Sequence, residues 1–242
     1  MSDPLLRVSQ VSKHFGGFTA LSQVSVEIVQ GERFGLIGPN GSGKTTLINC
    51  ISGSFRNDSG TIVFDGEDIS ALPAYQRTRL GIARSFQIPR PFSSMTVLEN
   101  LRVPLEYVVH RRSLHTADTG AEAMQILETM GLADKAQIQT NQLTQVDLRK
   151  LELARAMAAR PRLLISDEAM AGLSSNEVEE VLVILRKLND AGITIIMIEH
   201  IMKAVMSFSQ RVICLDAGRI ICEGTPESIV RDPEVQKAYL GA

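Results

Sequence analysis

The clearest candidate for chemistry is a glycine-rich segment at residues 38–45, which reads Gly-Pro-Asn-Gly-Ser-Gly-Lys-Thr. It follows an apolar segment that reads as a strand and opens one that reads as a helix, which is the context of a phosphate-binding loop. Backbone N–H groups and the positive end of the helix would surround phosphate oxygens, while Lys44 would reach the β- and γ-phosphates and the Thr45 hydroxyl would bind Mg²⁺. The sequence therefore predicts a nucleoside triphosphate site. The residues expected to bind nucleotide here are Gly38, Asn40, Gly41, Ser42, Gly43, Lys44, Thr45 and Thr46.

Two adjacent carboxylates form the second candidate. Asp167 and Glu168 directly follow the apolar segment 163–166, which reads as a strand. Because an open parallel sheet presents ligand groups at its strand ends, Asp167 would enter the Mg²⁺ shell and Glu168 would polarise an attacking water. A bare Asp-Glu pair after a strand is usually a solvated strand end. Its partnership with a phosphate-binding loop favours the catalytic interpretation.

The elements that must position these residues follow a parallel α/β pattern. Short β-rich segments come first, a mostly helical stretch follows from about residue 95 to 160, and strands and helices then alternate. Ser174 and Glu177 have the spacing of a capping box and predict the start of one helix. Strands are expected at 6–11, 21–29, 33–37, 60–64, 82–86, 163–166, 194–198 and 212–215, and the clearest helices at 44–51 and 175–188.

The composition favours a globular protein without an excess of positive charge. The chain has 242 residues, 44% of them hydrophobic, and a formal net charge of −2. This charge gives no reason to expect nucleic acid as a partner. The first residues are not expected to form a signal peptide, and the apolar runs are too short to span a bilayer. Any link to a membrane is expected to come through another protein.

In their order along the chain, these segments resemble the ABC ATPase family over essentially the whole sequence. Gln87, after the strand at 82–86, matches the glutamine of that family that touches Mg²⁺ and senses the membrane subunit. His200, after the strand at 194–198, matches the histidine that contacts the γ-phosphate, and Phe15 matches the aromatic residue that stacks on adenine. Taken alone, these residues would more often be strand-end polar groups and a core ring, so these roles are what the resemblance implies.

Four further runs look like one subgroup of the family, which energises uptake of branched-chain amino acids and similar small polar solutes. The runs are Phe15-Gly16-Gly17, Ala83-Arg84-Ser85-Phe86-Gln87, Thr96-Val97-Leu98-Glu99-Asn100 and Ala238-Tyr239-Leu240-Gly241. The resemblance implies a second ABC ATPase subunit, facing this one head to tail, and separate transmembrane permease subunits. It also implies, indirectly, a periplasmic or extracellular solute-binding protein, and a peripheral location on the cytoplasmic face of a bacterial or archaeal membrane.

The signature motif departs from the family pattern. A Leu-Ser-Gly-Gly-Gln type run is expected, but residues 143–147 read Leu-Thr-Gln-Val-Asp. Thr144 keeps a hydroxyl for nucleotide binding, whereas Val146 disfavours positive φ and Asp147 adds a negative charge beside a phosphate site. Alternatively, Thr144 and Asp147 form a helix capping box, and the helix N-terminus still binds phosphate. The loop at 171–174 also lacks the aspartate usual in the family.

The sequence therefore predicts a single ABC ATPase domain over residues 1–242, of α/β class, with an antiparallel β-subdomain and an inserted helical subdomain. The nucleotide-binding core is expected at 1–94 and 161–242, and the helical subdomain with the signature motif at 95–160.

The predicted function is ATP hydrolysis with Mg²⁺ to drive solute uptake. A second hypothesis is an ATP-binding regulatory half with weak hydrolysis, motivated by the altered signature. A third, a soluble ABC ATPase of translation or DNA repair, would favour tandem domains, long coiled coils or a basic surface, and none of these is visible. Catalytic roles are expected for Lys44, Gln87, Glu168 and His200, and metal binding for Thr45, Gln87 and Asp167.

Overall fold

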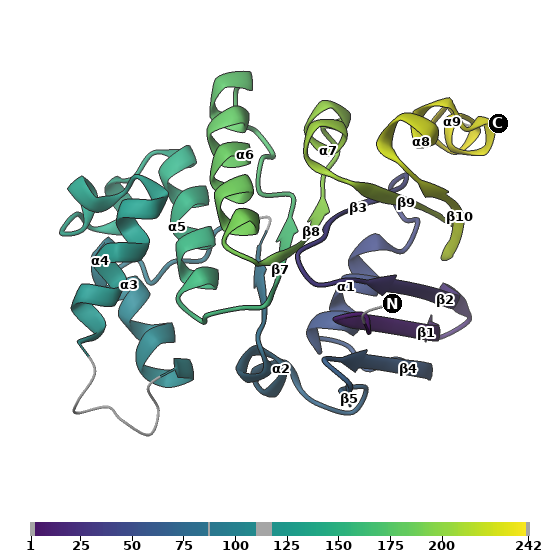
Figure 1. Ribbon diagram of the computed structural model, residues 1–242, viewed down its shortest axis with the longest axis horizontal. Coiled ribbons are helices and arrows are strands. Elements are labelled where there is room, and N and C mark those ends of the chain that lie inside the picture. Colours follow the sequence, from purple (N-terminus) through teal and green to yellow (C-terminus); the bar gives the residue numbers. More distant parts are fainter. Residues whose placement is uncertain (1–2, 87, 110–117, 241–242) are drawn as a thin grey trace.

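Two β-sheets and the helices packed on them make up the structure, a computed structural model that describes residues 3–86, 88–109 and 118–240 (Figure 1). The larger sheet has six strands in the order β10-β9-β3-β8-β7-β6. The neighbours from β9 to β6 are parallel, and β10 pairs antiparallel with β9. Because parallel strands end at one edge, the segments that follow β3, β7 and β8 lie at the same side of the sheet. The bounds are β3 Arg33–Ile37, β6 Ile82–Ser85, β7 Leu163–Asp167, β8 Thr194–Ile198, β9 Arg211–Asp216 and β10 Arg219–Gly224.

The smaller sheet is antiparallel, as predicted, and has the order β2-β1-β4-β5. A cluster of buried apolar residues joins this sheet, one face of the larger sheet and helix α1 (Lys44–Ser52) into one core, to which Leu6, Ile48 and Ile196 belong. The helix that begins at the phosphate-binding loop is therefore packed against the sheets along its buried side. The strands are β1 Leu6–Phe15, β2 Phe18–Ile28, β4 Ser59–Phe64 and β5 Glu67–Asp68.

Helices α6 (Ser175–Asp190) and α7 (Met202–Phe208) belong to a second buried cluster, together with residues of the larger sheet. The predicted capping box at the start of α6 is present, with Ser174 and Glu177 bonded to each other's backbone N–H. Val178, Val181, Leu185 and Leu188 share one face of this helix and are buried, so this face packs toward the core.

The stretch predicted to be helical forms one end of the molecule, on the left in Figure 1. It contains α3 (Val97–Pro104), the π-helix η1 (Leu105–Val109), α4 (Thr119–Met130), the 3₁₀ turns η2 (Ala133–Lys135) and η3 (Thr140–Gln142), and α5 (Gln145–Met157). Pro104 has no N–H to continue the α-helical ladder, which fits the change to a π-helix at Leu105. These helices share a buried cluster with α6 and the larger sheet, so the subdomain bounds at 94/95 and 160/161 stay a prediction.

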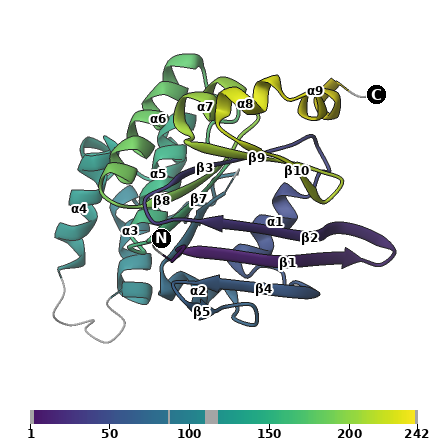
Figure 2. The same ribbon diagram turned by 45° about the vertical axis from the view of Figure 1, so that its right-hand side comes forward.

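Five elements were not predicted: β5, β10, α2 (Ala74–Leu80), α8 (Pro226–Arg231) and α9 (Pro233–Leu240). All five are short, so that their patterns span too few residues to show a period. Helices α8 and α9 lie beside the β9–β10 hairpin, where Figures 1 and 2 show them in yellow. Among the residues that the structure describes, no helix is long and apolar enough to cross a membrane.

Candidate functional site

The glycine-rich loop connects the end of β3 to the start of α1, as its spacing predicted. Gly43 is the N-cap of α1 with φ 108°, and a Cβ on it would lie 2.6 Å from Ala20 O. Gly38 has φ 149°, and a Cβ there would lie 2.2 Å from Leu215 O. Both positions therefore require glycine, because any side chain would meet backbone atoms and adopt a disfavoured φ. The loop is thus packed closely against the backbone of β2 and of the end of β9, ahead of the helix N-terminus.

Lys44 and Ser42 line the inside of this loop. Lys44 is 6% exposed, and its Nζ donates to Gly38 O at 2.7 Å and Pro39 O at 3.0 Å. Burial lowers the pKa of Lys44, while the carboxylates of Glu168 and Asp167 act in the opposite direction. Ser42 Oγ is buried and has no hydrogen-bond partner among the described residues. An orphaned hydroxyl, a buried ammonium and a helix N-terminus in one glycine-walled loop fit the phosphate groups of a nucleotide.

The second group of candidates lies at the ends of β7 and β8, which are neighbours in the sheet. Glu168 N donates to Ile198 O at 2.9 Å, and Glu168 has φ 49°, in the left-handed region. Such a conformation costs a non-glycine residue about 1–2 kcal/mol, and this kind of strain is concentrated at functional sites. His200 Nε2 lies 2.8 Å from Glu168 Oε1, so the two expected catalytic side chains are in contact.

Asp167 is bonded to a residue that no sequence argument had singled out for a role. Its Oδ2 accepts from Arg84 Nη2 at 2.5 Å, and Arg84 Nη1 donates to Asn49 Oδ1 at 2.6 Å. Arg84 therefore links α1, β6 and β7 beside the loop. Asp167 and Thr45 both offer oxygen atoms, the ligands that Mg²⁺ prefers, and the exposed Thr45 stands at the start of α1. These residues fit a metal held jointly by protein and phosphate oxygens.

The segment from Glu168 to Ala171 is held from two sides by buried charged residues. Met170 N donates to Glu199 Oε1 at 2.9 Å, and Arg149 Nη2, from α5, donates to Ala171 O at 3.1 Å. Glu199 is 2% exposed, and burial raises its pKa to about 7. Sequence reasoning missed Glu199; an acid between the apolar strand β8 and His200 was the signal that could have pointed to it.

The remaining expected residues lie at the end of β1, in the phosphate-binding loop and α1, or outside the described residues. Phe15, at the end of β1, is 45% exposed and packs edge-on against Phe55 with ring centroids 5.5 Å apart. Thr46 lies in the first turn of α1, and Asn40 and Gly41 are exposed in the loop. Gln87 falls outside the described residues, and its roles stay predictions.

Thr144 lies at the N-cap of α5, on the helical side of the molecule (Figure 1). The capping-box alternative is present: Asp147 N donates to Thr144 Oγ1 at 3.3 Å, and Thr144 Oγ1 donates to Asp147 Oδ2 at 2.6 Å. Lys135 Nζ also bonds Asp147 Oδ2, at 2.7 Å. The added negative charge is thus matched by a cation. Val146 lies in the first turn of α5, where its helical backbone needs no positive φ.

Comparison with known proteins agrees with this geometry. The sequence profile described as "ABC transporter" matches residues 21–171, and one described as "Branched-chain amino acid ATP-binding cassette transporter" matches residues 219–242. The chain is 39% identical, over 100% of its length and 99% of the relative's, to the high-affinity branched-chain amino acid transport ATP-binding protein LivG of Escherichia coli K12. It is 38% identical to a probable LivG of Archaeoglobus fulgidus, over 98% of this chain and 96% of that one.

Solved structures show the same fold. A nucleotide-free ATP-binding cassette from an ABC transporter superposes with a TM-score of 0.89 at 30% identity, covering 99% of this chain and 100% of that one. A cassette dimer in a post-hydrolysis state with ADP and Pi has a TM-score of 0.82 at 26% identity, covering 91% and 98%. Cassettes of this kind bind and hydrolyse ATP. The sequence, the fold and the loop geometry together show that the chain belongs to the ABC transporter family, as one of its ATP-binding cassettes.

Proposed function

We propose that the chain hydrolyses ATP with Mg²⁺ to energise an importer for branched-chain amino acids or similar small polar solutes. The observation that carries the site assignment is the contact between Glu168 and His200 at the sheet edge that also bears the phosphate-binding loop. The relatives are named as branched-chain amino acid transport proteins, which supports the solute class.

Each side chain has a role that follows from its surroundings. The loop N–H groups and Lys44 bind the β- and γ-phosphates, and Lys44 can leave its carbonyl partners for phosphate oxygens of higher charge. Thr45 and Asp167, with Gln87, hold Mg²⁺, which when bound neutralises charge on the phosphates. Glu168 accepts the proton of an attacking water, and His200 fixes the direction of that carboxylate through Oε1.

The proposed assembly has two cassettes facing head to tail, so that Thr144 and the N-terminus of α5 reach the nucleotide on the partner's loop. Permease subunits span the membrane, this chain lies on the cytoplasmic face, and a solute-binding protein delivers the solute from outside. The hypothesis of a regulatory half with weak hydrolysis is not favoured, because Asp147 is paired with Lys135.

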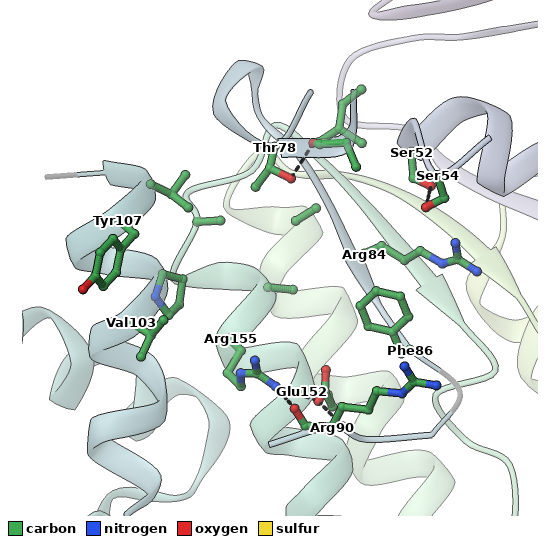
Figure 3. A pocket seen from close by; sticks show the side chains of 17 residues that line it. Ser52, Ser54, Thr78, Arg84, Phe86, Arg90, Val103, Tyr107, Glu152 and Arg155 are labelled. Carbon is green, nitrogen blue, oxygen red and sulfur yellow. Dashed lines mark hydrogen bonds and ion pairs between the residues drawn. The ribbon is translucent and has the colours of Figure 1, made fainter. Parts of the chain in front are cut away.

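A groove of about 420 Å³ offers a place for the permease (Figure 3). Apolar side chains of the helical part and the exposed Phe86 line it, with Phe86 and Tyr107 on opposite sides in Figure 3. We propose that a short cytoplasmic helix of the permease docks here. Phe92, which is also exposed, does not line this groove, and the Arg155 guanidinium lies 5.1 Å from the centre of its ring.

The test has two stages. The purified chain should release phosphate from ATP, and Glu168→Gln should keep ATP binding but slow hydrolysis by about 100-fold or more. In proteoliposomes with its permease subunits and solute-binding protein, ATP should drive uptake of labelled leucine but not of labelled glutamate. Equal hydrolysis by Glu168→Gln and wild type would remove Glu168 from its role, and ATP-driven uptake of glutamate without uptake of leucine would overturn the assignment to branched-chain amino acids.

A further inference from the structure

A hydrogen bond joins the C-terminal helix to the first residue of the phosphate-binding loop. Gly38 N donates to Tyr239 Oη at 2.8 Å, across 201 positions in the sequence. Tyr239 belongs to the run at 238–241 that resembles one subgroup of the family, and none of the roles assigned above uses it. The contact is therefore a feature of the nucleotide site that still lacks a function.

Gly38 lies in a crowded, buried part of the loop. The residue is buried, and its Cα lies so close to Leu215 O and Ser42 Oγ that a Cβ would stand 2.2 Å and 2.6 Å from them. A buried N–H without a partner is costly, so the Tyr239 hydroxyl stabilises the conformation in which the loop begins. The hydroxyl of Tyr239 is neutral at neutral pH, and partial burial raises its pKa further above the ordinary value of 10.

Helix α9 is itself anchored, so it can hold this hydroxyl in place. Asp232 Oδ1 accepts from Glu234 N at 2.9 Å and from Val235 N at 3.2 Å, and Asp232 Oδ2 lies 3.1 Å from Cys222 Sγ of β10. Val235 is 4% exposed and lies in the core cluster. Helix α9 thus reaches from β10, the edge strand of the larger sheet, to the loop after β3, which is the third strand from that edge (Figures 1 and 2).

We propose that Tyr239 is a positioning residue of the nucleotide site, and that the order of helix α9 is coupled to the occupancy of the phosphate-binding loop. The inference rests on the proposed nucleotide site. Without the hydroxyl, the nucleotide-free loop also populates conformations in which the Gly38 N–H is bonded to water. ATP binding must shift this population back to the ordered loop, which lowers the apparent affinity. Coupling is reciprocal, so bound nucleotide also holds α9 in place.

Tyr239→Phe tests this, because it removes the hydroxyl alone. Losing one hydrogen bond that shapes the free loop should weaken ATP binding by about fivefold, measured by titration with a fluorescent ATP analogue. Tyr75→Phe is the matched control. Tyr75 is 56% exposed on α2, which packs near the C-terminal end of α1. The Tyr75→Phe variant should therefore bind ATP with the affinity of wild type. ATP should also slow amide exchange at residues 234–239 in wild type and much less in Tyr239→Phe.

The outcomes separate this inference from the proposed function. A wild-type chain that binds no ATP would refute the nucleotide site itself. A Tyr239→Phe variant that binds ATP as wild type does would overturn the inference while leaving that site intact. A lower melting temperature with unchanged affinity and unchanged exchange would also overturn it, because a merely structural anchor for α9 predicts that result.

Discussion

Replacing Asp147 with asparagine separates a helix cap from an inhibitory charge in the altered signature. Asparagine has the same shape and keeps an oxygen for the Thr144 N–H, but it removes the negative charge. In the structure Asp147 Oδ2 accepts hydrogen bonds from Lys135 Nζ at 2.7 Å and from Thr144 Oγ1 at 2.6 Å. We therefore expect Asp147→Asn to lower stability and leave ATP turnover nearly unchanged.

The expected loss of unfolding free energy is about 1–2 kcal/mol, the sum of a charge-assisted hydrogen bond and a carboxylate at a helix N-terminus. The Lys135 side chain is 32% exposed, so solvent screens part of the ion pair and the lower half of that range is expected. For a chain of this length, this corresponds to a melting temperature lower by about 4 °C.

The pH dependence of this loss follows from the surroundings of Asp147. Burial alone would raise the pKa of Asp147, but hydrogen bonds from Lys135 and Thr144 outweigh it and lower the pKa below 3.8. The charge therefore stabilises the fold above pH 3.8, and the difference between wild type and variant should fade as the pH falls through the lowered pKa.

Thermal unfolding and steady-state ATPase assays should be made on wild type, Asp147→Asn, Lys135→Met and the double variant. Because the two residues are partners, the double variant should lose less stability than the sum of the single variants. An Asp147→Asn variant that is as stable as wild type and turns over ATP several times faster would refute the cap. That result would instead support the interpretation of Asp147 as a negative charge that slows hydrolysis at the phosphate site.

Three further predictions follow from the site. Lys44→Ala should weaken ATP binding at least about tenfold, since it removes a charged bond to phosphate, and unchanged affinity in an ATP titration would contradict its role. Burial raises the pKa of Glu199 from 4.5 to about 7, so the native state binds a proton more tightly than the unfolded state does. The stability of the wild type therefore falls as the pH rises from 4.5 to 7, because the buried carboxyl group becomes charged. Relative to wild type, Glu199→Gln should therefore gain up to about 3 kcal/mol between pH 5 and pH 8 in urea unfolding, and a pH-independent difference would show that Glu199 does not titrate there. Replacing Phe86 or Tyr107 with alanine should reduce transport in proteoliposomes more than basal ATPase activity; equal losses would argue against a docking groove.

The sequence allowed the fold and the positions of the candidate residues to be predicted, but not their contacts. The strand, loop and helix around residues 33–51 were predictable, because glycine spacing and apolar periodicity are local signals. Strand order is not a local signal. The rule that a parallel sheet presents ligand groups at its strand ends was applied to Asp167 and Glu168, whereas the role of His200 came only from the family resemblance. Arg84 read as an ordinary strand residue, and its bond to Asp167 depends on the pairing of β6 with β7.

The bonds around the nucleotide site share one physical feature, which is that each loop is held by a side chain from a distant segment. Tyr239 holds the start of the phosphate-binding loop, Arg84 holds Asp167, and Glu199 holds Met170. A loop ordered in this way has already lost its conformational entropy on folding, so nucleotide binding need not supply that free energy again. It follows that a change in α9, β6 or the end of β8 can alter nucleotide affinity without touching the nucleotide. Motif residues alone therefore do not determine how well this cassette binds ATP.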